Sequence, residues 1–129
     1  MRIQVKLNKR FTANELTPPS VLNAIGKSAV SEVKKNFEAQ GRPKWQPSKR
    51  GGKTLQDTGR LRDSVKHKIE SGRVFLTSNL SYARIHNYGG IIRTRYAVIQ
   101  MPKREFMILP SNFDKKVASI VKQYVGYVE

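Results

Sequence analysis

The sequence contains no cysteine among its 129 residues. This absence excludes disulfides, thiolate metal sites and cysteine nucleophiles, and it fits a reducing cytoplasm. No run of about 18 apolar residues is present, which argues against a membrane-spanning helix. The first ten residues, MRIQVKLNKR, alternate polar and apolar side chains and lack the continuous apolar stretch of a signal peptide. We therefore expect a protein without a membrane span or a secretory leader.

Acidic residues are scarce, since nine Asp and Glu stand against 25 Lys and Arg, giving a formal net charge of +16. A chain this basic attracts polyanions through its field alone, with an affinity that falls steeply with salt. Nucleic-acid phosphates or acidic protein neighbours would both match this charge, and a solvated basic surface is the third explanation. The few acids are scattered, which argues against a Mg²⁺-dependent nuclease.

Motifs that carry catalysis or bind metals are also missing. The sequence has no HExxH, GxSxG or GxxxxGK[ST] pattern. The segment SKRGGKT has the glycines of a phosphate loop, but it lacks the spacing, the preceding strand and the following helix. We therefore expect no enzyme, no cofactor and no metal site.

Two long helices are predicted from apolar side chains that recur at three- and four-residue spacings. The first starts at residues 18–20 (PPS) and stops at Gly41. Its apolar stripe consists of Leu22, Ile25, Ala29, Val33 and Phe37. The second begins at a cap formed by Ser111 or Asn112. Its stripe consists of Phe113, Val117, Ile120, Val121 and Tyr124.

Shorter elements fill the middle of the chain. Residues 2–7 alternate as a half-buried strand does, and a short helix follows a cap at Asp57 or Thr58. Segments 65–70 (VKHKIE) and 73–78 (RVFLTS) predict a hairpin, and residues 91–109 look extended and partly hairpin-like. Together these patterns predict a single α+β domain over residues 1–129. In it, the long N-terminal helix and the C-terminal helix pack on a small antiparallel sheet.

Two further features concern local contacts. Gly26 weakens the first helix and predicts a close approach to a neighbouring element. His67 lies in the alternating segment VKHKIE, where its side chain either points inward or sits near a sheet edge.

Residues 42–56 form a long basic loop with the only tryptophan, Trp45. A loop of this length inside a compact domain is typically functional or mobile. Trp45 either stacks on nucleic-acid bases or, as the reading we favour, packs as an anchor that holds the loop to the body or to a neighbouring subunit.

The stretch YARIHNYGG places His86 in a helical turn that closes on a glycine C-cap. Because no other reactive group accompanies it in the sequence, a structural role is favoured over a catalytic or metal-binding one. In that role the ring donates one N–H to a backbone carbonyl and packs its carbons against the sheet.

Four segments occur in a recognisable order: FEAQGRPKWQPS, LQDTGRLRDSV, LTSNLSYARIHNYGG and MPKREFMIL. In this order they resemble the phage virion morphogenesis family, over about residues 30–113. The resemblance implies a structural virion protein of a tailed bacteriophage or prophage that completes the tail or neck and stabilises head–tail joining. Such a protein would assemble in the host cytoplasm and lie in the virion neck.

The resemblance also implies partners. These are other copies of the chain in a ring, the head-completion or connector proteins, the tail-terminator or tail-tube proteins, and genomic DNA in a channel. The resemblance implies six-fold symmetry for the ring. The loop 42–56 and an extended arm at 91–104 are the expected assembly segments, while Gly59, Gly89 and Gly90 are expected at turns. The alternative is a small basic protein that binds DNA without sequence preference.

Two sets of site residues follow. The expected assembly contacts are Trp45, Arg50, Arg60, Arg62, Tyr88, Arg93 and Arg95. The expected phosphate contacts in a DNA channel are Lys44, Lys49, Arg50 and Lys53.

Overall fold

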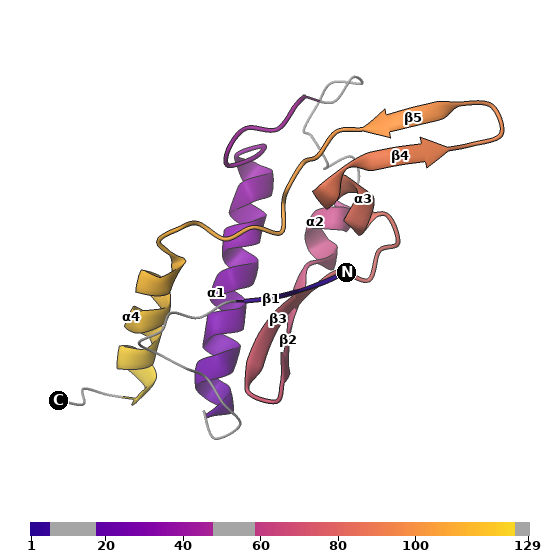
Figure 1. The fold of residues 1–129 in the computed structure, drawn as a ribbon. Coiled ribbons are helices and arrows are strands. Elements are labelled where there is room, and N and C mark those ends of the chain that lie inside the picture. The colour runs from indigo at the N-terminus through magenta and orange to yellow at the C-terminus, as the bar shows by residue number, and fades with distance from the viewer. Residues whose placement is uncertain (6–17, 48–58, 126–129) are drawn as a thin grey trace.

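The computed structural model describes residues 1–5, 18–47 and 59–125, and Figure 1 shows the arrangement of their elements. The fold is α+β, which confirms the predicted class. The helices are α1 (Pro19–Glu38), α2 (Arg60–Ser64), α3 (Ala83–Tyr88) and α4 (Phe113–Val125). The strands are β1 (Arg2–Gln4), β2 (Lys66–Glu70), β3 (Arg73–Thr77), β4 (Gly90–Arg93) and β5 (Val98–Met101).

Helix α1 lies at the centre of the fold and has close to its predicted bounds. Pro19 stands at its start, where a missing N–H costs no helical hydrogen bond. The helix ends at Glu38, and the chain turns at Gly41, whose φ is 104°. Every residue of the predicted apolar stripe is buried: Leu22, Ile25, Ala29, Val33 and Phe37. The stripe is therefore the spine of the hydrophobic core.

Strands β1, β3 and β2 form an antiparallel sheet in that order. The predicted hairpin is confirmed, because β2 and β3 join through Ser71 and Gly72, whose φ values of 51° and 75° suit a type I′ turn. Helix α1 packs on β2 and β3. Strand β1 ends at Gln4, earlier than the predicted strand 2–7, of which residues 6–7 lie outside the described part.

Gly26 confirms the predicted close approach between α1 and a neighbouring element. A Cβ built on Gly26 would lie 2.4 Å from Cδ2 of His67, which belongs to β2 at the edge of the sheet. The His67 ring is half-buried, with Nε2 3.2 Å from Oδ1 of Asn23. Only glycine at position 26 leaves room for this ring, so the contact sets how closely the helix and the sheet approach.

Helix α4 packs on α1, on the side away from the three-stranded sheet (Figure 1). Its predicted apolar face is confirmed at Phe113 and Val117, which are buried, and at Ile120 and Val121, which pack against the core. The side chain of Tyr124 lies outside the described part. The C-terminal helix thus reaches the sheet through α1, not by packing on the sheet itself.

The short helix before the hairpin is confirmed as α2, but its cap differs from the prediction. Gly59, with a φ of 75°, takes the N-cap position, one or two residues after the predicted caps. Those predicted caps, Asp57 and Thr58, lie outside the described residues.

Candidate assembly surface

A two-stranded ribbon, which we call the arm (residues 90–101), projects away from the body of the molecule (Figure 1). Strands β4 and β5 pair antiparallel from Gly90 opposite Met101 to Arg93 opposite Val98. This confirms that the segment predicted as extended and partly hairpin-like folds as a hairpin. Among the described residues, these two strands pair only with each other.

The glycines after α3 create the base of the arm. Gly89 ends α3 as its C-cap, with φ 72° and ψ −177°, a conformation that side chains disfavour. A Cβ there would also lie 2.9 Å from the backbone nitrogen of Lys103. Gly90 and Gly59 likewise have positive φ values, as predicted for turns. Gly89 thus lets the chain leave α3 and pass directly beside the strand that returns from the arm.

A buried polar network fixes the segment that returns from the arm, residues 102–109. The Oδ1 atom of Asn87 accepts hydrogen bonds from the backbone N–H groups of Phe106 and Met107, at 3.0 and 2.9 Å. On the other side, Nδ2 of Asn36 donates to the carbonyls of Phe106 and Ile108, at 2.8 and 2.9 Å. Because both amides are fully buried, the segment is held between α3 and α1.

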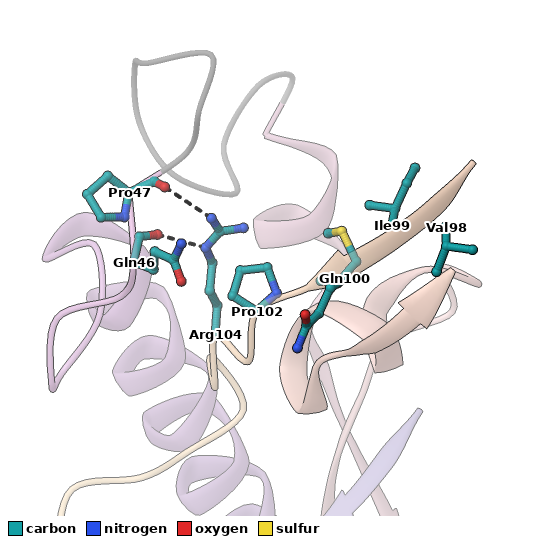
Figure 2. Close-up of a pocket in the computed structure, with 8 residues that line it drawn as sticks. Gln46, Pro47, Val98, Ile99, Gln100, Pro102 and Arg104 are labelled. Atoms are coloured by element: carbon teal, nitrogen blue, oxygen red, sulfur yellow. Dashed lines mark hydrogen bonds between the residues drawn. The ribbon is translucent and has the colours of Figure 1, made fainter. Parts of the chain in front are cut away.

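Arg104 joins the same segment to the chain that follows α1. Its guanidinium donates to the carbonyls of Gln46, at 2.9 Å, and Pro47, at 3.3 Å (Figure 2). Its backbone N–H donates to the His86 carbonyl, at 2.9 Å. The side chain is 8% exposed. Three of the four motif segments therefore meet at the base of the arm: the chain after α1, helix α3, and residues 101–109.

Trp45 belongs to this base and not to an outer surface. Its ring is buried and meets the edge of Phe37, with ring centroids 5.6 Å apart. Its Nε1 donates to the Glu105 carbonyl at 3.3 Å. The ring is therefore enclosed by its own chain, as in the favoured interpretation of Trp45 as an anchor that holds the loop to the body.

His86 is half-buried in α3, with its ring at 5.8 Å from that of Tyr82. The predicted donation of a ring N–H to a backbone carbonyl is wrong for Nδ1, which is buried without a hydrogen-bond partner among the described residues. Burial and the charge of Arg104 lower the pKa of His86, so the ring is neutral near pH 7. The helical turn with its glycine C-cap is confirmed.

The other predicted site residues do not form one cluster. Tyr88, Arg93 and Arg95 are exposed and belong to the arm or its base. Arg60 and Arg62 lie on α2, where Arg62 pairs with Asp63 at 3.1 Å. Lys44 is exposed in the chain after α1. Lys49, Arg50 and Lys53, with most of the loop 42–56, lie outside the described residues.

Exposed apolar side chains concentrate on the arm. Tyr96 at its tip is 89% exposed, and Val98 and Ile91 are 64% and 56% exposed. In antiparallel strands, directly opposed residues share a face, so Ile92 and Ile99 lie on one face, while Ile91 and Val98 lie on the other. Both faces of the arm therefore carry aliphatic side chains.

A groove of about 800 Å³ runs along the inner side of the arm base (Figure 2). Strand β5, Pro102 and Arg104 line one side, and Gln46 and Pro47 line the other. Its lining is mixed, because the aliphatic side chains of β5 and two prolines lie beside the side chains of Gln46 and Gln100. The Arg104 guanidinium in this lining is bonded to the carbonyls of Gln46 and Pro47.

The described residues also bear on metal binding and on membrane spanning. No group of three His, Asp or Glu side chains there is placed to hold a metal ion. None of the helices described is long and apolar enough to cross a bilayer.

Most residues that build the base of the arm were not predicted from the sequence. Asn36 and Asn87 were not singled out, and neither was Arg104 beyond its place in a motif. The sequence contains one indication of this network. The polar residues Glu32 and Asn36 lie four residues apart on the buried side of α1, which is otherwise apolar. A polar side chain at a core position has to find a partner, but the backbone carbonyls to which Asn36 donates are 70 and 72 residues away in the sequence.

Comparison with known proteins gives matches over most of the chain. The sequence profile of the phage virion morphogenesis family matches residues 3–126. A curated relative, the Mu-like prophage FluMu G protein 2 of Haemophilus influenzae, is 30% identical over 105 residues, which covers 81% of this chain and 75% of the relative. No solved structure matches the chain. The match spans the core, the base of the arm and the arm itself, and the chain belongs to the phage virion morphogenesis family.

Proposed function

We propose that this protein completes the tail or neck of a tailed bacteriophage or prophage particle and stabilises the joining of head and tail. The observation that carries the proposal is the family match over residues 3–126, which supports a structural role in phage morphogenesis. The similarity to a G protein of a Mu-like prophage agrees with it. In this function the protein works as a component of the particle and is assembled in the host cytoplasm.

The proposal includes assembly into a ring around the DNA channel, with head-completion and tail proteins as neighbours. A ring needs heterologous contacts, in which one surface of a subunit meets a different surface of the next. A positive lumen suits passing DNA because phosphate contacts need no base recognition. Lys44, which is exposed, is the described candidate for such a contact, and the other lysines proposed for it lie outside the described residues.

Deletion of the gene tests the proposal. Cells producing the phage without this protein should accumulate DNA-filled heads and separate tails, seen by electron microscopy. Purified protein added to that lysate should restore joined, infectious particles. Normal joined particles from the deletion would contradict the proposal, and images of the assembled neck would show directly whether the protein forms a ring.

A basic protein that binds DNA on its own is the second candidate, favoured by the net charge of +16. It predicts that the purified protein binds duplex DNA tightly at physiological salt and without sequence preference, measured by titration. Weak binding at that salt concentration would mean that the net charge attracts DNA only as a general field and that DNA binding is not the function.

A further inference from the structure

The arm carries more uncovered apolar surface than a two-stranded ribbon can keep in water. Isolated two-stranded hairpins are marginally stable at best, and they usually gain stability by packing one face on a core. Here both faces present aliphatic side chains, including Ile91 on one and Ile99 on the other, at 56% and 44% exposure. Contiguous exposed apolar surface of this kind marks an interaction site.

The tip of the arm is ordered before any partner arrives. The Thr94 hydroxyl oxygen accepts hydrogen bonds from the N–H groups of Ala97, at 2.9 Å, and Tyr96, at 3.3 Å, and the Thr94 N–H donates to the Ala97 carbonyl at 2.8 Å. This closed turn presents Arg95 and Tyr96 outward, with the guanidinium 5.8 Å from the ring. Tyr and Arg are the residue types that most often anchor interfaces, and a preformed turn lowers the entropy cost of docking them.

Charge indicates what kind of surface the arm meets. From Ser71 to Arg104 the sequence contains no Asp or Glu. The same stretch contains six basic residues: Arg73, Arg84, Arg93, Arg95, Lys103 and Arg104. Like charges brought together at an interface cost free energy, and opposite charges speed association. The surface that covers the arm is therefore acidic around an apolar centre.

The described part of a second copy of this chain does not provide that surface. The acids of the described part are few, and most are already paired within the chain. Glu32 is buried beneath Arg42 and Lys116. The acids Asp63, Glu70 and Glu105 pair with Arg62, Arg2 and Lys103, respectively. Two copies also carry +16 each. Duplex nucleic acid supplies negative charge, but its outer surface is lined by phosphates, so it covers aliphatic side chains such as Ile91 and Val98 on both faces of the arm less completely than a protein groove does.

We propose that the arm docks into an apolar groove with an acidic rim on a different protein, with Tyr96 as its central anchor and Arg93 and Arg95 at the rim. This docking proposal deepens the proposed function. It rests on that function in one respect, because the proposed function makes the partner a neighbouring protein of the virion. The docking itself follows from the arm and its charge alone.

Photo-crosslinking in cells that produce the phage tests the docking. The photo-reactive amino acid p-benzoylphenylalanine replaces Ala97, which is exposed beside Tyr96, and in a matched control it replaces Ala118, which is exposed on α4. Position 97 should give a cross-link, identified by mass spectrometry, to a different protein with an acidic surface, and position 118 should not give that product. A cross-link from position 97 to another copy of this chain, a cross-link to DNA, or no cross-link would each overturn the proposal.

A charge reversal tests the acidic rim. Arg93→Glu combined with Arg95→Glu should lower the yield of the cross-link from position 97 by about tenfold, which corresponds to about 1.4 kcal/mol. The matched control, Lys34→Glu with Lys115→Glu, makes the same charge change at exposed helix positions and should leave the yield within about twofold. Equal cross-link yields in the two double variants would overturn the proposal that the partner's groove has an acidic rim.

Failure of the proposed function and failure of the docking proposal give different experimental results. If particles assemble normally without the gene, the head–tail role is wrong, while the cross-link from position 97 still identifies whatever covers the arm. If deletion blocks joining but position 97 links only to another copy, the function stands and the docking proposal is wrong.

Discussion

Glu32 joins three parts of the chain at a single carboxylate. It is buried in α1 and accepts hydrogen bonds from Arg42, at 3.0 Å, from Lys35, at 3.4 Å, and from Lys116 of α4. Burial raises the pKa of Glu32, but the hydrogen bonds from Lys116 and Arg42 outweigh it and lower the pKa to about 2, against an ordinary value of 4.5. The carboxylate is therefore held ionised and ties α4 to α1.

A pH dependence follows from this shift. Because the pKa of Glu32 is lower in the folded than in the unfolded chain, its stabilisation is complete above about pH 5 and is lost as the pH falls toward 2. Glu32→Gln should lower the free energy of unfolding by about 2 kcal/mol at pH 7 and flatten its slope between pH 5 and 2. Urea unfolding at several pH values measures both, with Glu38→Gln, an exposed change on the same helix, as the control. An unchanged slope in Glu32→Gln would contradict the assignment.

Gly26 provides a second test at the residue scale. Alanine favours a helix over glycine by about 1 kcal/mol, but its Cβ would meet the His67 ring at 2.4 Å. We expect Gly26→Ala to lower the free energy of unfolding by about 1 to 3 kcal/mol, because overpacking outweighs propensity. The loss should shrink in a His67→Ala background, which removes the ring, and a double-mutant cycle measures the difference. A stabilised Gly26→Ala protein would show that the strand moves away at little cost.

At the scale of elements, the periodic and local features were accessible from the sequence. The stripe of α1, the Ser71–Gly72 turn and the glycine end of α3 each depend on residues within a few positions, and all three are confirmed. The packing of α4 on α1, and the capture of residues 106–108 by Asn36 and Asn87, depend on contacts across the chain. Spacing alone carries no information about such contacts. The arm was predicted as a segment, but the apolar character of both its faces required the strand register.

The Thr94 hydroxyl makes several of the hydrogen bonds that order the arm tip, since it also donates to the Ala97 carbonyl. Thr94→Val keeps the shape of the side chain but removes the acceptor used by the N–H groups of Tyr96 and Ala97. Amide hydrogen exchange at Ala97 should accelerate by about five- to tenfold, the equivalent of one hydrogen bond, while the global stability changes by less than about 0.5 kcal/mol. Thr77→Val, which removes one long bond to Lys66 on the three-stranded sheet, is the control and should leave the tip unchanged. Unaltered exchange at the tip in Thr94→Val would show that the strands alone order the turn.

At the scale of the whole molecule, the net charge of +16 and the acid-free stretch 71–104 have different consequences. The net charge acts on any polyanion through a general field, whereas the arm combines charge with apolar surface and an ordered tip. The two effects can be separated because attraction by a general field depends on the number of charges and only weakly on their position. A docking site responds to position.

Duplex DNA provides the measurement that separates them. We expect the purified protein to bind duplexes of unrelated sequence equally, with a logarithm of the binding constant that falls linearly with the logarithm of salt concentration. The arm variant Arg93→Glu with Arg95→Glu and the helix variant Lys34→Glu with Lys115→Glu should reduce that slope by similar amounts, since each changes the charge equally. Only the arm variant should lose its protein cross-link. A slope reduced by the arm variant alone would instead place DNA on the arm, because a position-dependent phosphate contact, and not the net charge, would then hold the duplex.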